Sequence, residues 1–206
     1  MDIIDRKIVD YSICRNWGHI PSALTQGTYL RHLLPNPVLG DYHWVAGKPF
    51  GAQAWYVLLG MDCDSPLLQP PIVDWNCQSI GHSLGYSIGV STHRPVWLNI
   101  SDASLERGDF WEALMLWHKF KRHCLFVTVD CNGYGCKHPC EKIEDLYNKI
   151  LSFNVACCIA QPDDVCIQDG IVLVDTSSSL GSKMKRLGMH YTKFKSFEDF
   201  YAQCCG

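Results

Sequence analysis

The stretch Val96-Trp97-Leu98-Asn99-Ile100-Ser101-Asp102 is a short apolar run that ends in polar residues. A second run of this kind, Leu125-Phe126-Val127-Thr128-Val129, leads into Asp130-Cys131-Asn132. Both runs are typical of strands that are buried on both faces of a sheet. Between them, from Ser104 to Lys121, apolar residues recur with the period of a helix. We therefore predict a βαβ unit whose right-handed crossover brings Asp102 and Asn132 together at the carboxyl ends of neighbouring parallel strands.

The rest of the chain alternates helices and strands without an internal repeat. Further helices are expected at about 21–34, 51–59, 79–91, 141–153 and 196–205, and further strands at about 156–160 and 171–174. Prolines between Gly60 and Pro71 predict a surface loop. The pattern predicts an α/β fold, in which one domain of 206 residues contains a parallel sheet covered by helices on both faces.

Asp102 and Asn132 are candidate ligands of a metal ion that holds a diphosphate. Their carboxylate and amide oxygens suit Mg²⁺, which accepts few protein ligands when phosphate oxygens complete its shell. The amides of Ala103 to Leu105 begin the predicted helix, where backbone N–H groups favour phosphate. In the alternative interpretation, Asp102 is only a helix N-cap and Asn132-Gly133 is only a turn.

Composition argues against several classes of protein. The net charge is −3 and no long basic run occurs, so nucleic acid is not the expected main partner. No apolar stretch approaches the thickness of a bilayer, and Met1–Lys7 lacks the apolar core of a signal peptide, so we expect no membrane association and a cytoplasmic location. The twelve cysteines are scattered through the chain and are expected to be mostly buried free thiols.

Four residues depart from this scatter. Cys131, Cys136, His138 and Cys140 are close enough in sequence to form a small structural zinc loop, although their spacing is not that of a paired zinc knuckle. The alternative is a cysteine-bearing loop after the second strand.

The predicted helix at 79–91 carries Gly81, Gly85 and Gly89 at intervals of one turn. Glycine inside a helix costs about 1 kcal/mol relative to alanine, so this stripe indicates close approach by another backbone or a ligand. Helix packing within the chain and a seam between two copies of it are both open interpretations.

The motifs resemble the diphosphate-binding domain of the transketolase family, whose cofactor is thiamine diphosphate. Ser101-Asp102-Ala103-Ser104, followed by Val129-Asp130-Cys131-Asn132-Gly133, is similar to the family's Gly-Asp-Gly to Asn cofactor motif. Gly18-His19-Ile20-Pro21-Ser22 resembles its early Gly-His segment, and Ser79-Ile80-Gly81-His82-Ser83-Leu84-Gly85 resembles its Ser-Leu-Gly-x-Gly-Leu segment. The resemblance covers most of the chain and implies the thiamine-diphosphate-binding fold.

The resemblance also implies roles for individual residues. It implies catalytic roles for His19 and Glu112, cofactor contacts by Ser79, Gly81, Asp102, Ala103 and Asn132, and Mg²⁺ ligation by Asp102, Asn132 and the carbonyl of Tyr134. His190 is a further candidate for a late active-site histidine. His19 suits a part in proton transfer, because an imidazole changes charge near neutral pH.

The sequence departs from the family pattern at several positions. Ser101 and Ala103 replace both glycines of the Gly-Asp-Gly element, and the methyl group of Ala103 narrows the approach of a phosphate. Phe50 stands where the family commonly has an active-site histidine, and Arg107 stands where a glutamate is usual. The loop at 60–71 is too short for the family's further Gly-His-Pro element.

In the family, a second domain binds the aminopyrimidine ring and supplies the glutamate that activates the cofactor, and we expect that pyrimidine-binding domain to be absent here. The resemblance therefore predicts a subunit of a split transketolase-like enzyme, in which this chain positions the cofactor and a partner activates it for ketol or two-carbon transfer on a sugar or sugar phosphate. The alternative is a non-catalytic paralogue with an interaction or regulatory role. A zinc-stabilised binding module is a third hypothesis.

Overall fold

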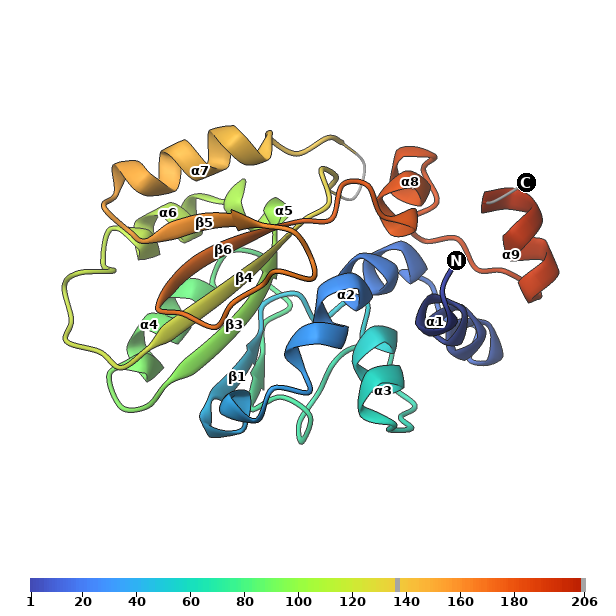
Figure 1. The fold of residues 1–206 in the computed structure, drawn as a ribbon, viewed down its shortest axis with the longest axis horizontal. Helices are drawn as coiled ribbons and strands as arrows, with labels where there is room; N and C mark the ends of the chain where they lie inside the picture. The colour runs from blue at the N-terminus through green and yellow to red at the C-terminus, as the bar shows by residue number, and fades with distance from the viewer. Residues whose placement is uncertain (136–137, 205–206) are drawn as a thin grey trace.

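The structure is a computed structural model that describes residues 1–135 and 138–204. Its centre is a six-stranded sheet in which every neighbouring pair of strands is parallel (Figure 1). The order across the sheet is β2-β1-β3-β4-β6-β5. The strands are β1 (His43–Ala46), β2 (Trp75–Asn76), β3 (Val96–Ser101), β4 (Leu125–Cys131), β5 (Cys157–Ala160) and β6 (Gly170–Asp175). The predicted parallel α/β fold is thus confirmed.

Helices cover both faces of the sheet (Figure 1). The core on one face includes residues of α1 (Ile3–Cys14), α2 (Ile20–Leu33), α3 (Gln53–Leu59), α8 (Leu180–Arg186) and α9 (Phe197–Cys204). Of these, α1 and α9 lie beyond α2 and α3, away from the sheet (Figure 1). The other face is covered by α4 (Ser83–Ser91), α5 (Asp102–Leu105), α6 (Gly108–Leu114) and α7 (Ile143–Ser152). A short 3-10 helix, η1 (Pro37–Asp41), precedes β1. Among the described residues, no helix combines the length and apolar character needed to cross a bilayer.

The central strands have side chains buried on both faces, which explains their nearly continuous apolar sequence. Toward α2 and α3, Trp97 packs against Trp55 with ring centroids 5.3 Å apart. On the opposite face, Leu98 and Val127 belong to the core beneath α4, α6 and α7. β3 and β4 are paired in register from Val96 and Leu125 to Ser101 and Asp130, so the residues that follow them emerge at the same edge of the sheet.

The single helix predicted from Ser104 to Lys121 is wrong. The segment forms two short helices, α5 and α6, separated by an extended Arg107 with φ −101° and ψ 136°, and it continues as turns after Leu114. The indole of Trp111 donates a hydrogen bond of 2.7 Å to the carbonyl of Leu105, which stabilises the break. The next residue after the break, Gly108, has a weak preference for helix.

The helix predicted at 79–91 begins later than expected, at Ser83. Gly81 precedes it with φ +102°, a conformation that favours glycine. Gly85 faces Ala113 of α6, where an added Cβ would lie at 3.7 Å, whereas an added Cβ at Gly89 would meet open space. Gly85 therefore packs within the chain, and a seam between two copies stays a prediction. The sequence analysis also missed α1, β1, β2 and α8.

Candidate functional site

A cavity of about 220 Å³ opens at the carboxyl ends of the central strands. The connection from β1 to β2 contains α3 on one face of the sheet, and the connection from β2 to β3 contains α4 on the other face. The strand order therefore reverses beside β1, and ligands bind at such a position in open α/β folds. The residues that matter for its chemistry are His19, Lys48, Phe50, Tyr134, Lys185 and His190. They come from the start of α2, the segment after β1, the turn after β4, and the region of α8.

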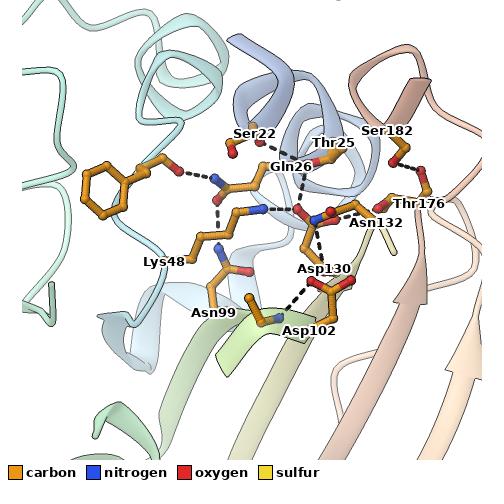
Figure 2. Close-up of polar contacts among 12 residues, drawn as sticks. Ser22, Thr25, Gln26, Lys48, Asn99, Asp102, Asp130, Asn132, Thr176 and Ser182 are labelled. Atoms are coloured by element: carbon orange, nitrogen blue, oxygen red, sulfur yellow. Dashed lines mark hydrogen bonds and ion pairs between the residues drawn. The ribbon is translucent and has the colours of Figure 1, made fainter. Parts of the chain in front are cut away.

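Asp102 and Asn132 lie at this edge of the sheet, as their positions after β3 and β4 predict, and both are buried. Asp102 accepts hydrogen bonds from two backbone amides, Ala103 N at 2.9 Å and Gly133 N at 2.7 Å (the first is drawn in Figure 2). Its side chain therefore joins the start of α5 to the turn after β4. Burial, together with the nearby Asp130 carboxylate, raises the pKa of Asp102 to about 6.

Asn132 takes part in a tight turn and also accepts a hydrogen bond from a cation. Its side-chain oxygen accepts a hydrogen bond of 3.1 Å from Tyr134 N, and Gly133 has φ +77°, so the segment is a tight turn. The same oxygen also accepts a hydrogen bond of 3.0 Å from the Nζ of Lys185. The turn therefore presents an oxygen ligand to a cation, and that cation is a lysine.

Lys185 reaches the site from α8. Besides Asn132, its Nζ donates to the carbonyl oxygen of Tyr134 at 3.4 Å. These two acceptors are two of the three ligands that the sequence analysis assigned to a metal ion. Burial lowers the pKa of Lys185 to about 8, and the Lys48 ammonium acts in the same direction, while the carboxylates of Asp130 and Asp102 oppose the change.

Lys48 forms a second buried cation, paired with Asp130 (Figure 2). The Asp130 carboxylate also accepts hydrogen bonds from Thr25 Oγ1 at 2.6 Å and Thr176 Oγ1 at 2.5 Å. Burial by itself would raise the pKa of Asp130, but the two lysine ammonium groups outweigh it and hold that pKa below its usual value. Two lysines and two aspartates thus balance in charge at the base of the cavity.

A buried amide network joins Gln26 to Asn99 and to the backbone of Phe50 (the contact between Gln26 and Asn99 is drawn in Figure 2). Gln26 Nε2 donates to the carbonyl of Phe50 at 2.7 Å, and Gln26 Oε1 accepts from Asn99 Nδ2 at 2.9 Å. Asn99 Oδ1 in turn accepts from Tyr29 and Thr128, at 2.7 and 2.9 Å. Because each buried polar group has a partner, the network fixes α2 to β3, β4 and the segment after β1.

His19 lines the cavity in a left-handed conformation, with φ 59° immediately before α2. Its ring stacks on Phe50 at a centroid distance of 4.8 Å and meets the edge of His190 at 5.0 Å. Among the described residues, the buried Nδ1 atoms of both histidines have no hydrogen-bond partner. Burial, followed by repulsion from Lys185, lowers the pKa of His19 to about 4 and that of His190 to about 3, so both rings are neutral near pH 7.

The other residues suggested by the sequence are more dispersed. Ala103 and Tyr134 line the cavity beside Lys185. Glu112 is exposed on α6, and Ser79 is exposed in the segment before α4. Gly81 is buried against Arg107, whose Cβ would lie 2.8 Å from an added Cβ. The structure therefore gathers His19, Asp102, Asn132 and Tyr134 near the cavity, and leaves Glu112 and Ser79 on the surface.

The expected magnesium ligands are present but do not fit a divalent metal ion. Both oxygens of Asp102 accept backbone N–H groups, and the oxygens of Asn132 and Tyr134 accept the Lys185 ammonium. The zinc hypothesis depends on Cys136, which lies outside the described residues. Within residues 1–135 and 138–204, no group of three or more histidine, cysteine, aspartate or glutamate residues is arranged to hold a metal. The described cysteines are free thiols as expected, but the expectation that most are buried is wrong, because only Cys77 and Cys131 among them are buried.

Lys185 is not predicted from the sequence as a site residue, and no role is predicted there for Lys48 or Asp130. Lys185 lies in the run Lys183-Met184-Lys185-Arg186, which looks like an exposed basic stretch, and its neighbours Lys183 and Arg186 are exposed. Lys48 follows β1, and Asp130 lies at the end of β4. That placement was the one signal available for them, since polar residues at the carboxyl ends of parallel strands commonly face a ligand site.

Two solved transketolases share this fold. The transketolase from Leishmania mexicana matches 83% of this chain with a TM-score of 0.58 and 12% sequence identity. A mutant transketolase from Pichia stipitis matches 83% of this chain with a TM-score of 0.56 and 15% identity. This chain spans 35% and 34% of those two proteins, or about a third of their length. No protein-family model and no curated protein sequence matches it. The fold is that of a transketolase-like domain.

Proposed function

We propose that this chain is the cofactor-binding half of a split transketolase-like enzyme, and that it binds thiamine diphosphate in the cavity above β1, β3 and β4. The observation that carries the proposal is that Asn132 Oδ1 and the Tyr134 carbonyl oxygen both accept hydrogen bonds from one cation beside that cavity, while the buried Asp102 carboxylate is bonded to Gly133 N in the same turn. These residue types in this order match the family's diphosphate motif. Here the cation is Lys185 rather than magnesium, and an ammonium is also a good partner for phosphate.

The chain's own residues have defined tasks in this proposal. Lys185 attracts the diphosphate, and Ser22 and Ser104, which also line the cavity, are residues whose hydroxyl groups suit phosphate oxygens. His19 and His190, neutral near pH 7, offer hydrogen bonds to a sugar or sugar-phosphate substrate. When bound, thiamine diphosphate supplies the carbon nucleophile for two-carbon transfer. A partner subunit with a pyrimidine-binding domain supplies its activation, in the cytoplasm.

A non-catalytic paralogue is the second candidate function. Phe50 favours it, because this ring stacks on His19 at 4.8 Å where the family commonly has a second histidine. A phenyl ring cannot transfer a proton. The exposed Glu112 also lacks a described contact with the cavity and depends on a partner for any catalytic role.

Thermal unfolding in the presence of thiamine diphosphate tests the proposal. A ligand that binds only the folded chain raises the unfolding temperature in a concentration-dependent way. We expect thiamine diphosphate to do so in wild type, and thiamine without the diphosphate to have little effect. Absence of any shift, with or without magnesium and with a pyrimidine-domain partner present, would refute cofactor binding. A shift without ketol transfer in the presence of that partner would favour the non-catalytic paralogue.

A further inference from the structure

The Lys185 ammonium is hydrogen-bonded to two of the three groups that the sequence predicts as ligands of a metal ion. Nζ lies 3.0 Å from Asn132 Oδ1 and 3.4 Å from the Tyr134 carbonyl oxygen, and the Asp102 carboxylate attracts it. We propose that Lys185 is a built-in cation that replaces the divalent metal, so that the site binds phosphate groups without a metal ion. The part that concerns phosphate rests on the proposed function; the exclusion of metal does not.

The oxygen atoms of Asp102 and Asn132 accept hydrogen bonds from the backbone of the neighbouring turns. The two oxygens of Asp102 accept the amides of Ala103 and Gly133, and Asn132 Oδ1 accepts the amide of Tyr134 in addition to Lys185. A divalent ion that used Asn132 and Tyr134 as ligands would have to displace the ammonium. Lys185 donates hydrogen bonds to the oxygens of Asn132 and Tyr134, and the hydrogen bond from Tyr134 N to Asn132 Oδ1 is kept.

Charge leads to the same conclusion. Lys48 is paired with Asp130, and Lys185 is the cation nearest to the Asn132 turn that lines the cavity. A divalent ion beside this buried ammonium would be strongly repelled, because few water molecules screen the two charges. A phosphate carries the opposite sign. An ammonium has three donors, and Lys185 gives two of them to described residues, so a third is available to a phosphate oxygen.

The position of Lys185 is set by the docking of α8 on α2. Gly181 lies so close to α2 that an added Cβ would be 2.3 Å from the carbonyl oxygen of Pro21. Ser182 Oγ donates to the carbonyl of Thr176 at 2.8 Å, which ties the helix to the segment after β6. Met184 is completely buried in the core beside it. The packing of α8 therefore fixes the position of Lys185 at the site.

Binding of Mn²⁺, measured through the electron paramagnetic resonance signal of the free ion, tests the exclusion of metal. Wild type should leave the signal unchanged. Lys185→Ala should bind Mn²⁺ at least about tenfold more tightly than wild type, because it vacates Asn132 and Tyr134. Adding Asp102→Asn should abolish that gain. Lys183→Met, an exposed position on the same helix, is the matched control and should behave like wild type. Mn²⁺ binding by wild type that is lost in Asp102→Asn would overturn the proposal.

Thermal shifts with inorganic diphosphate test the second part. In EDTA, diphosphate should stabilise wild type and Lys183→Met, and its apparent affinity should fall at least about tenfold in Lys185→Met, which keeps the length of the side chain without its charge. A wild-type shift that requires excess Mg²⁺ would overturn the proposal. If diphosphate and thiamine diphosphate fail to shift wild type under every condition, the proposed function fails, while the Mn²⁺ measurement on wild type still decides whether Lys185 excludes metal. That measurement holds even if the Lys185 variants do not fold.

Discussion

Lys48, just after β1, forms a buried ion pair with Asp130 at the end of β4, and β3 lies between those two strands. Lys48 is 7% exposed and Asp130 is fully buried, so each charge depends on the other. The pair connects the wall of the cavity to the centre of the sheet. It also leaves Lys185 as the cation that faces the Asn132 turn.

Breaking this pair should be strongly destabilising. Lys48→Met and Asp130→Asn should each lower the free energy of unfolding by about 3–5 kcal/mol, because each leaves an uncompensated buried charge. The double variant should lose less than the sum of the two. Urea denaturation measures these values, with Asp10→Asn as the control, since the exposed pair of Arg6 and Asp10 should contribute about 0–1 kcal/mol. Additive losses would show that the two side chains do not interact.

Stability should depend on two cavity histidines in weakly acidic solution. An unfolded histidine gains a proton as the pH falls through 6.5, whereas His19 and His190 stay neutral in the folded chain down to about 4 and about 3. The unfolded state therefore binds more protons between 6.5 and about 4, so these residues make stability fall as the pH falls. Asp102, with its pKa raised from 3.8 to about 6, contributes with the opposite sign.

The variant His190→Gln isolates the histidine contribution. Its urea midpoint should fall less than that of wild type between about pH 7 and about pH 5. His93→Gln, at an exposed position, is the control and should follow wild type. An unchanged pH dependence in His190→Gln would mean that this ring is protonated in the folded chain as readily as in the unfolded one.

Glycine positions in two helices should respond in opposite ways to alanine. Gly181→Ala should destabilise the chain by about 1–3 kcal/mol or more, because the new methyl group would lie 2.3 Å from the backbone of α2. Gly89→Ala meets no atom within 4 Å and should stabilise α4 by about 0.5–1 kcal/mol. Chemical denaturation measures both. Equal effects at the two positions would contradict the close docking of α8 on α2.

The break between α5 and α6 should depend on the indole of Trp111. Trp111→Phe removes the hydrogen bond of 2.7 Å to the Leu105 carbonyl and should cost about 1–2 kcal/mol, partly through lost packing. Trp75→Phe is the control for the packing part, because Trp75 is also half-buried and stacks on Tyr86 at 4.0 Å. If Trp111→Phe lowers the free energy of unfolding no more than Trp75→Phe does, the hydrogen bond of the Trp111 indole does not stabilise the break between α5 and α6.

The sheet and the pair of Asp102 and Asn132 were predictable because the relevant signals are local. Each residue follows an apolar strand, and the connection between two neighbouring parallel strands brings their ends together. The prediction of a single crossover helix was wrong because the spacing of apolar residues does not reveal where a backbone breaks. The Trp111 indole and the extended Arg107 end α5 after four residues.

Sequence alone determined the parallel α/β architecture and the polar edge at which β3 and β4 end, because the hydrophobic period of each segment and the alternation of strands with helices can be read from consecutive residues. Only the tertiary structure decided which cation lies at that edge. Lys185 and Asn132 are 53 residues apart, and Lys185 stands between exposed basic neighbours. The docking of α8 on α2 selects this lysine for burial, because it turns one side of a short basic helix toward the cavity while Lys183 and Arg186 stay in solvent.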